Sequence, residues 1–257
     1  MSTRPNLAAQ TGPSSTIWGH MPYEVAPDLY YGHMEHFANF DQTTGLCGPG
    51  GGLVIDAGSS VALQTDQVGG VLRLTTQNVD ADSVTWVTGD NTAGFGKFTA
   101  GKKIAFECRI KPTQIVTQDL CIGLASEALA ASTSLIADAD TQADVDFVGF
   151  VALAATPSVL NAVFNTASGG GITTVKTTAQ TMVAGTWYRL GVYCDGTRVT
   201  WFVNGLPITS TAIVHPVPIT RANFPDGEEL AAYIQIQATT TTAVSVDVDW
   251  ANWAMEL

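Results

Sequence analysis

The stretch WYRLGVYCDGTRVTWFVNG, residues 187–205, constrains the fold more than any other part of the chain. Its Asp195–Gly196 pair tolerates the positive backbone angles of a tight hairpin turn. Apolar residues alternate with other residues on both sides of this turn: Leu190, Val192, Cys194, Val199, Trp201 and Val203. Because alternate residues of a strand point to the same side, the stretch predicts two antiparallel strands that share one buried face.

Short strand patterns separated by turn residues continue from Leu53 to the end of the chain. In KKIAFECRIKP, for example, Ile104, Phe106, Cys108 and Ile110 share one face of a strand. Strands at this spacing, without a repeat of fixed period, predict an all-β, antiparallel β-sandwich over residues 51–257. The alanine-rich segment 125–144 is the one place where we expect a short helix.

The first 50 residues have a different composition. They contain five prolines, which exclude a long helix or a central strand. They also contain more aromatic residues than a disordered tail would. The aromatic residues that we expect to make contacts are Trp18, Tyr23, Tyr30, Tyr31, Phe37 and Phe40. We therefore predict an extended N-terminal arm, residues 1–50, that packs on its own domain or on a neighbouring subunit.

Charge and composition exclude several partners and sites. Charged residues make up only 13% of the chain, and the net charge is -12. This acidic balance argues against binding to nucleic acid or to an anionic membrane surface. No segment has the ~18 consecutive apolar residues of a membrane span, and the N-terminus lacks the apolar core of a signal peptide, so we expect synthesis in a cytoplasm. The four cysteines form no CxxC pair, so we expect buried, reduced thiols and no zinc site.

Three stretches resemble the concanavalin A-like jelly rolls, the group of laminin-G-like domains, legume-type lectins and family-16-like glucanases. GTWYRLGVYCDGTRVTWFVNGLPI resembles their late strands, KKIAFECRIKP is similar to an early strand, and VSVDVDW is similar to the last one. The resemblance covers residues ~50–257 and implies a jelly-roll sandwich. This fold hosts binding, hydrolytic and structural proteins alike, so it does not select a function.

The sequence contains no convincing set of catalytic residues. A glycosidase needs two carboxyl groups, about 5–5.5 Å apart in retaining enzymes. The glucanases that the chain resembles carry them in a Glu-x-Asp-x-x-Glu pattern, which is absent here. The nearest pairs are Asp144 with Asp146 and Asp247 with Asp249. We therefore expect no catalytic residues and a protein that is not an enzyme, with glycoside hydrolysis as a further alternative.

Metal and sugar sites remain as alternatives. The segment DADTQADVD could hold calcium through its carboxylate oxygens, and we predict no other cofactor or metal. Sugars stack on exposed aromatic rings, and Trp86 and Phe95 are the candidate contacts for a glycan. The alternation of Trp86 with Val84 favours the core as its alternative place.

The leading functional prediction is a non-enzymatic structural protein of a virion, such as a capsid decoration or a head or tail appendage of a bacteriophage. The aromatic arm and the low charge suit a surface packed against other capsid subunits. We expect a homo-oligomer, with a trimer favoured, located in the virion. The alternative is a lectin-like, carbohydrate-binding module that recognises surface glycans.

Overall fold

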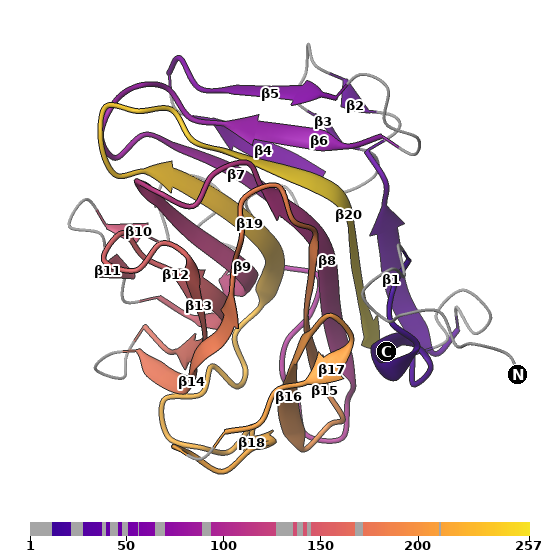
Figure 1. Cartoon of the computed structure of the whole chain (residues 1–257). Coiled ribbons are helices and arrows are strands. Elements are labelled where there is room, and N and C mark those ends of the chain that lie inside the picture. Colours follow the sequence, from indigo (N-terminus) through magenta and orange to yellow (C-terminus); the bar gives the residue numbers. More distant parts are fainter. Residues whose placement is uncertain are drawn as a thin grey trace, which may run out of the picture.

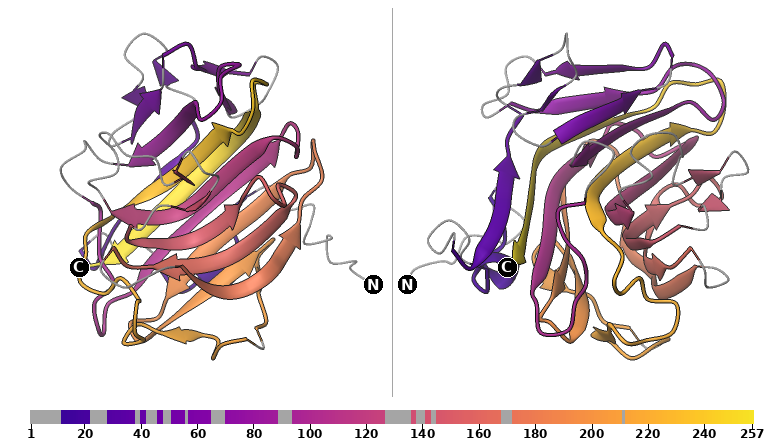
Figure 2. Two further views of the ribbon diagram at one scale, coloured as in Figure 1. Left: turned by 90° about the vertical axis from the view of Figure 1, so that its left-hand side faces the viewer. Right: turned by 180° about the vertical axis from the view of Figure 1, so that it is seen from behind.

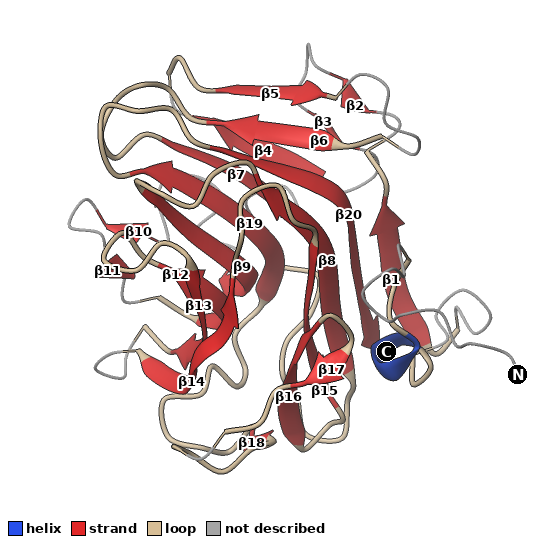
Figure 3. Cartoon of the chain, viewed as in Figure 1, coloured by secondary structure: helices blue, strands red, loops and turns tan. Residues whose placement is uncertain are grey.

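The computed structural model is a sandwich of two antiparallel sheets with one very short helix among its described residues (Figures 1 and 3). The described residues are 12–21, 28–37, 40–41, 46–47, 51–55, 57–64, 70–88, 94–126, 136–137, 141–142, 145–167, 172–210 and 212–257. The helix, α1 (Ser15–Trp18), has four residues. The predicted all-β antiparallel sandwich is confirmed.

The first sheet, sheet A, contains the hairpin formed by residues 187–205. Its strands in spatial order are β17 (Leu206–Pro207), β16 (Arg198–Val203), β15 (Tyr188–Cys194), β8 (Ile104–Pro112), β20 (Ser245–Glu256), β6 (Leu72–Thr75) and β5 (Ser60–Leu63). Two more strands join it: β1 (Tyr30–Glu35) pairs with β20, and β18 (Val217–Pro218) pairs with β16. Strands β15 and β16 form the predicted hairpin, with Val192 opposite Trp201.

The second sheet, sheet B, packs against the first. Its strands in spatial order are β14 (Thr173–Thr181), β13 (Val159–Asn165), β12 (Phe147–Ala152), β9 (Gln118–Ser126), β19 (Leu230–Ala238), β7 (Ser83–Thr88), β4 (Gly51–Ile55), β3 (Leu46–Cys47) and β2 (Phe40–Asp41). A separate hairpin joins β10 (Ile136–Ala137) to β11 (Thr141–Gln142). The described parts of 125–144 are thus strands where we expected a helix, because strand pairing overrides weak helix propensity.

The main core lies between the two sheets and is rich in aromatic residues. Trp86 and Trp201 are both fully buried in it. The indole Nε1 of Trp201, on sheet A, donates a hydrogen bond of 2.9 Å to the backbone oxygen of Gly149 on sheet B. This bond satisfies the one polar atom of a buried indole and joins the sheets. Cys108, Cys121 and Cys194 are buried and free, as predicted.

The N-terminal residues belong to the sandwich wherever the structure describes them. Strand β1 lies beside the C-terminal half of β20, so residues 30–35 meet the end of the chain at one end of sheet A (Figures 1 and 2). Phe37 is buried in the main core, and β2 and β3 extend sheet B. The expected contacts of residues 1–50 with neighbouring subunits stay a prediction. No helix among the described residues is long and apolar enough to cross a membrane.

Candidate functional site

The outer face of sheet B, which points away from the main core, carries a set of polar side chains. Strand pairing places Gln237 between Ser83 and Asp119. Two residues away on β19, and on the same face, Gln235 lies between Thr85 and Cys121. Side chains opposite one another on adjacent strands lie ~5 Å apart. These rows could donate and accept hydrogen bonds to the hydroxyl groups of a ligand if the face were open.

The outer face of sheet B is closed by an apolar cluster. The buried residues of this cluster are Val87, Cys121, Ala125, Ile136, Phe147, Val151, Val163, Ala231 and Tyr233. Ile136 comes from the hairpin β10–β11, which lies beside β12 in Figure 1. Burial raises the pKa of the Tyr233 hydroxyl far above its usual value, although a hydrogen bond with Thr85 opposes the shift. Gln235, Gln237 and Asp119, in the polar rows beside this cluster, are buried as well.

Two described carboxyl groups near this face, those of Asp119 and Asp146, are too far apart to act as a glycosidase pair. Asp119 lies near the start of β9, whereas Asp146 lies opposite Ser126 at its end. Seven residues of strand, at 3.3 Å each, separate the two positions by about 23 Å. Each carboxylate also accepts a hydrogen bond from the backbone. The N–H of Ala154 donates to Asp119, and the N–H of Ala167 donates to Asp146. Asp144, its predicted companion, lies outside the described residues.

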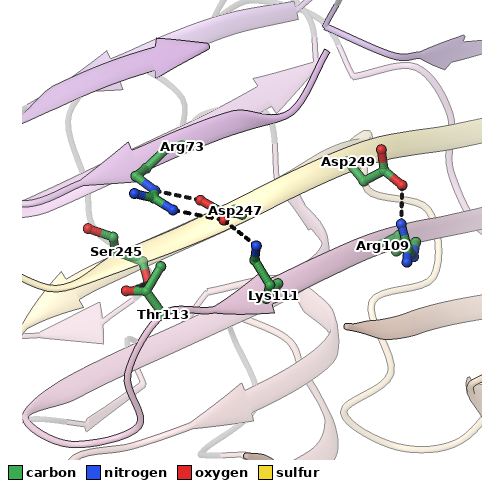
Figure 4. A network of polar contacts seen from close by, with 7 residues as sticks. All are labelled: Arg73, Arg109, Lys111, Thr113, Ser245, Asp247 and Asp249. Carbon is green, nitrogen blue, oxygen red and sulfur yellow. Dashed lines mark hydrogen bonds and ion pairs between the residues drawn. The ribbon is translucent and has the colours of Figure 1, made fainter. Parts of the chain in front are cut away.

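The second predicted pair, Asp247 and Asp249, lies on sheet A and is engaged in ion pairs (Figure 4). Arg73 donates two hydrogen bonds to Asp247, of 2.6 and 3.0 Å, and the Nζ of Lys111 lies 2.9 Å from the same carboxylate. Asp249 accepts a hydrogen bond from Arg109. Both aspartates thus neutralise protein cations. Among the described residues, no group of three or more His, Cys, Asp or Glu side chains could hold a metal ion, and the calcium expectation for DADTQADVD concerns residues that are mostly outside them.

The two aromatic candidates for glycan contact have different places. Trp86 is fully buried, in edge contact with Phe37 at 5.7 Å and beside Trp253 at 5.8 Å between ring centroids. The prediction that Trp86 contacts a glycan is wrong, because its large ring fills the core. Phe95 is half-buried, with its ring 6.3 Å from that of Trp253. Phe95 stays a candidate contact.

The aromatic side chains of the predicted arm also differ in how far they are exposed. Tyr30 and Phe37 are buried within their own chain, and Trp18 is half-buried. Among the described aromatic residues of the arm, only Tyr31 is exposed, so only Tyr31 presents most of its ring to a neighbour. Tyr23 and the side chain of Phe40 lie outside the described residues.

An exposed apolar surface lies at the end of sheet A where β1 meets β20. Leu29, Tyr31 and Leu257 are 55%, 56% and 55% exposed, and we call these three residues the β1 patch. The N–H of Leu257 donates a 2.8 Å hydrogen bond to the oxygen of Leu29, and Tyr31 lies opposite Met255. The three side chains therefore share one face of a strand pair. Within the described residues, β1 pairs only with β20.

Sequence reasoning missed a buried polar cluster on the outer face of sheet A. Glu107 is fully buried, and Arg189 is nearly so. Both residues lie at outward-facing positions of their strands, which usually are solvated. The N-terminal residues 12–21 cover them, and no local pattern in the sequence signals this contact.

Comparison with known proteins supports the fold and leaves the family open. No protein-family model and no curated protein matches the chain. A protein of unknown function from Shewanella oneidensis MR-1 has a similar structure, with a TM-score of 0.59, 14% identity and coverage of 99% of this chain and 97% of that one. A family 16 endo-glucanase from Bacteroides ovatus has a TM-score of 0.56 at 12% identity, covering 86% and 99% of the two chains. An endo-β-1,4-glucuronan lyase from Trichoderma reesei has a TM-score of 0.54 at 11% identity, covering 88% and 94%.

These similarities show that the chain has the concanavalin A-like jelly-roll fold of the glucanases. They also overturn the prediction that the protein is not an enzyme, because several of the similar structures are glucanases and one is a lyase. Identities of 11–14% show the fold alone.

Proposed function

We propose that the protein is a structural component of a virion that assembles with other copies of itself. The β1 patch is the observation that carries this proposal. Soluble proteins expose single apolar residues everywhere, but a contiguous apolar surface marks an interaction site. Here three large apolar side chains gather on one strand pair, at a strand edge that can also pair with another chain.

The rest of the surface supports assembly. Only 13% of the residues are charged, about half the usual share in soluble domains. Interfaces between subunits are depleted in charge and enriched in aromatic residues such as Tyr31. A virion protein, which spends most of its life packed against other subunits, suits this composition.

The test of assembly is the mass of the full chain in solution, measured by light scattering. We expect a trimer or a larger assembly, and we expect Tyr31→Lys to weaken it by about tenfold or more, since a lysine would be desolvated at the contact. Val79→Lys, which replaces an exposed residue of the loop before β7, is the matched control and should leave the mass unchanged. A monomer at every concentration would contradict the proposal. Mass spectrometry of purified virus particles then tests the virion location.

Carbohydrate binding is the second candidate, and the surroundings of Phe95 favour it. The ring of His33 lies 5.2 Å from Trp253, which is also the neighbour of Phe95. His33 in turn lies 3.4 Å from the carboxylate of Glu35. Partly exposed aromatic rings with a few polar side chains nearby are typical of small-ligand sites.

The test of this candidate is retention of the full chain on glycans, with β-glucans and glucuronan included because the similar structures act on them. We expect Phe95→Ala to reduce retention and Val183→Ala, at an exposed position elsewhere, to preserve it. The same samples are assayed for reducing sugars and for unsaturated products, which report hydrolysis and elimination. The absence of both retention and products would exclude this candidate.

A further inference from the structure

Strand β1 has hydrogen-bonding partners on one side only. It lies beside β20 at the margin of sheet A, and among the described residues it pairs with no other strand (Figure 1). The N–H of Leu257 donates a 2.8 Å hydrogen bond to the oxygen of Leu29, which fixes the alternation along the pair. The odd-numbered residues of β1 therefore direct their N–H and C=O groups toward β20. The even-numbered residues Tyr30, Gly32 and Met34 direct theirs away from it, and we call these backbone groups the β1 edge.

The β1 edge has no backbone partner in the part of the chain that the structure describes. Outside the pairing with β20, no backbone hydrogen bond involves Tyr30, Gly32 or Met34 there. A row of unpaired N–H and C=O groups is a template on which another strand can pair. The six residues of β1 make this row about 20 Å long. It can therefore hold a partner segment of similar length.

The strands at the other margins of the two sheets are short or irregular. β5 has four residues, and β17 and β2 have two each. β14 has nine residues, but its register against β13 shifts twice, and Thr178 has a positive φ of 53°. β14 also carries Lys176. Short length, bulges and lysine are the features by which edge strands avoid pairing with other chains. β1 has none of them, since its six residues pair with β20 in one continuous register.

The side chains around the β1 edge indicate which kind of segment fits it. Leu29 and Tyr31 are 55% and 56% exposed and lie on one face of the strand pair. Side chains on that face of an added strand would contact them. The two ends of β1 are acidic, with exposed Asp28 before it and Glu35 as its last residue, and the chain has a net charge of -12. These charges repel an acidic segment and attract a basic one. The matching segment has apolar residues at alternate positions and basic residues at its ends.

We propose that the β1 edge accepts an extended segment of a partner protein, apolar at alternate positions and basic at its ends, as an additional strand of sheet A. Hydrogen bonds to the backbone of Tyr30, Gly32 and Met34 provide the affinity, and the apolar face beside Tyr31 selects the side chains. This inference goes beyond the assembly of identical copies, because it concerns backbone groups rather than the side chains of the β1 patch. The addition of a partner strand and the assembly of copies can therefore fail independently.

Hydrogen exchange of the full chain tests whether the β1 edge is open. We expect the amides of Tyr31, His33 and Glu35, which face β20, to exchange at least about tenfold more slowly than those of Gly32 and Met34, after correction for intrinsic rates. Equal protection of both sets at every protein concentration would mean that the chain itself covers the edge, which overturns the proposal. Protection of Gly32 and Met34 that rises with protein concentration would mean that a second copy fills the edge. That result would overturn the partner segment and support assembly.

A synthetic strand tests the binding itself. The probe is an end-capped peptide of eight residues in which valine and threonine alternate between two lysines. We expect the peptide to slow exchange at Gly32 and Met34 and to bind about tenfold more weakly when glutamates replace its lysines. Met34→Pro removes one N–H from the edge, at a kind of position where proline is tolerated. We expect this variant to bind the peptide about tenfold more weakly. Met34→Ala, which keeps the N–H, is the matched control and should bind as the wild type does.

An N-methylated peptide tests the same contact without any change in the protein. It lacks the N–H groups that pair with β1, so we expect it not to bind. Absence of binding by the unmodified peptide, or equal binding of the two peptides, would overturn the proposal. Equal binding by Met34→Pro and the wild type would overturn it as well, provided that the melting temperature of the variant shows a folded protein. Light scattering of the wild type without peptide reports on assembly separately, and its result stands whichever peptide binds.

Discussion

The outer faces of the two sheets both bury side chains, but by different means. On sheet A, charged residues are buried together with their partners, and a terminal segment covers part of them. On sheet B, an apolar cluster buries the face, with Ile136 of an internal hairpin as one of its members. The terminal segment of residues 12–21, which we call the strap, can leave without unfolding the sheet beneath it, whereas an apolar cluster built from several strands unfolds with the sheet.

This difference makes the outer face of sheet A the better place for reversible binding and that of sheet B a contributor to stability. Reversible contacts with a partner need a surface that opens at low cost, and such elements come from the less stable parts of a protein. The strap face of sheet A meets this condition. The cluster on sheet B is expected to act as a second core, and the polar rows beside it are buried too, which makes them a demanding place for a ligand to enter.

The largest expected effect is the loss of a large side chain from the cluster on sheet B. Phe147→Ala removes a fully buried ring, and we expect the free energy of unfolding to fall by about 3–5 kcal/mol. Ile17→Ala removes an equally buried side chain from the strap. Its effect on the free energy of unfolding should be smaller. The substitution can remove at most the free energy with which residues 12–21 dock on sheet A. Urea unfolding of both variants measures the difference.

Equal losses in the two variants would contradict this contrast. They would mean that the strap unfolds only with the sandwich. Hydrogen exchange sharpens the comparison: in Ile17→Ala, the amides of residues 14–18 should lose protection while those of β8 and β15 keep it.

The second effect concerns the ion pairs on sheet A. Burial alone would raise the pKa of Asp247, but hydrogen bonds from Arg73 and Lys111 outweigh it and lower the pKa below 3.8. A lowered carboxyl pKa stabilises the fold above the unfolded value, and this stability is lost as the pH falls through the folded value. We expect Asp247→Asn to cost about 1 kcal/mol at neutral pH, because half-exposed Arg73 is screened by solvent.

Acid titration of the unfolding free energy checks this prediction. The wild-type protein should lose stability below pH 4, and Asp247→Asn should lose less over the same range. Asp28→Asn, at an exposed position, is the control and should titrate like the wild type. A steeper acid loss in Asp247→Asn would contradict the assignment.

The sequence predicted local features well and long-range contacts poorly. The Asp195–Gly196 turn, the alternation around it and the burial of the three described cysteines were read correctly, because they depend on neighbours within a few residues. The sequence left open whether Trp86 lies in the core or contacts a glycan. Alternation shows that a residue faces one side of a sheet, but it does not show what covers that side. The contact of Ser14 with Glu107 joins residues 93 positions apart, and Arg73 meets Asp247 across 174 positions. No local pattern announces which strands become neighbours.

The smallest effect, and the most specific test of the strap, is the pH dependence of its docking. Burial raises the pKa of Glu107 above its ordinary 4.5, although Ser14, Trp18 and the charge of Arg189 oppose the shift. A raised carboxyl pKa means that the docked state favours the protonated form. Docking is therefore strongest below pH 4.5 and weakens as the pH rises through the raised value. Glu107→Gln keeps the shape and an acceptor oxygen but cannot ionise.

We expect the protection of the Ser14 amide, corrected for intrinsic exchange, to fall with rising pH in the wild type and to stay level in Glu107→Gln, with a change of less than about 1 kcal/mol at neutral pH. Asp247→Asn serves as the control, since it alters sheet A at a carboxylate that the strap does not contact. The same slope in the wild type and Glu107→Gln would assign the pH dependence to other groups. Protection that rises with pH in the wild type would mean that the donors from the strap outweigh burial at Glu107, so that the strap binds the ionised carboxylate.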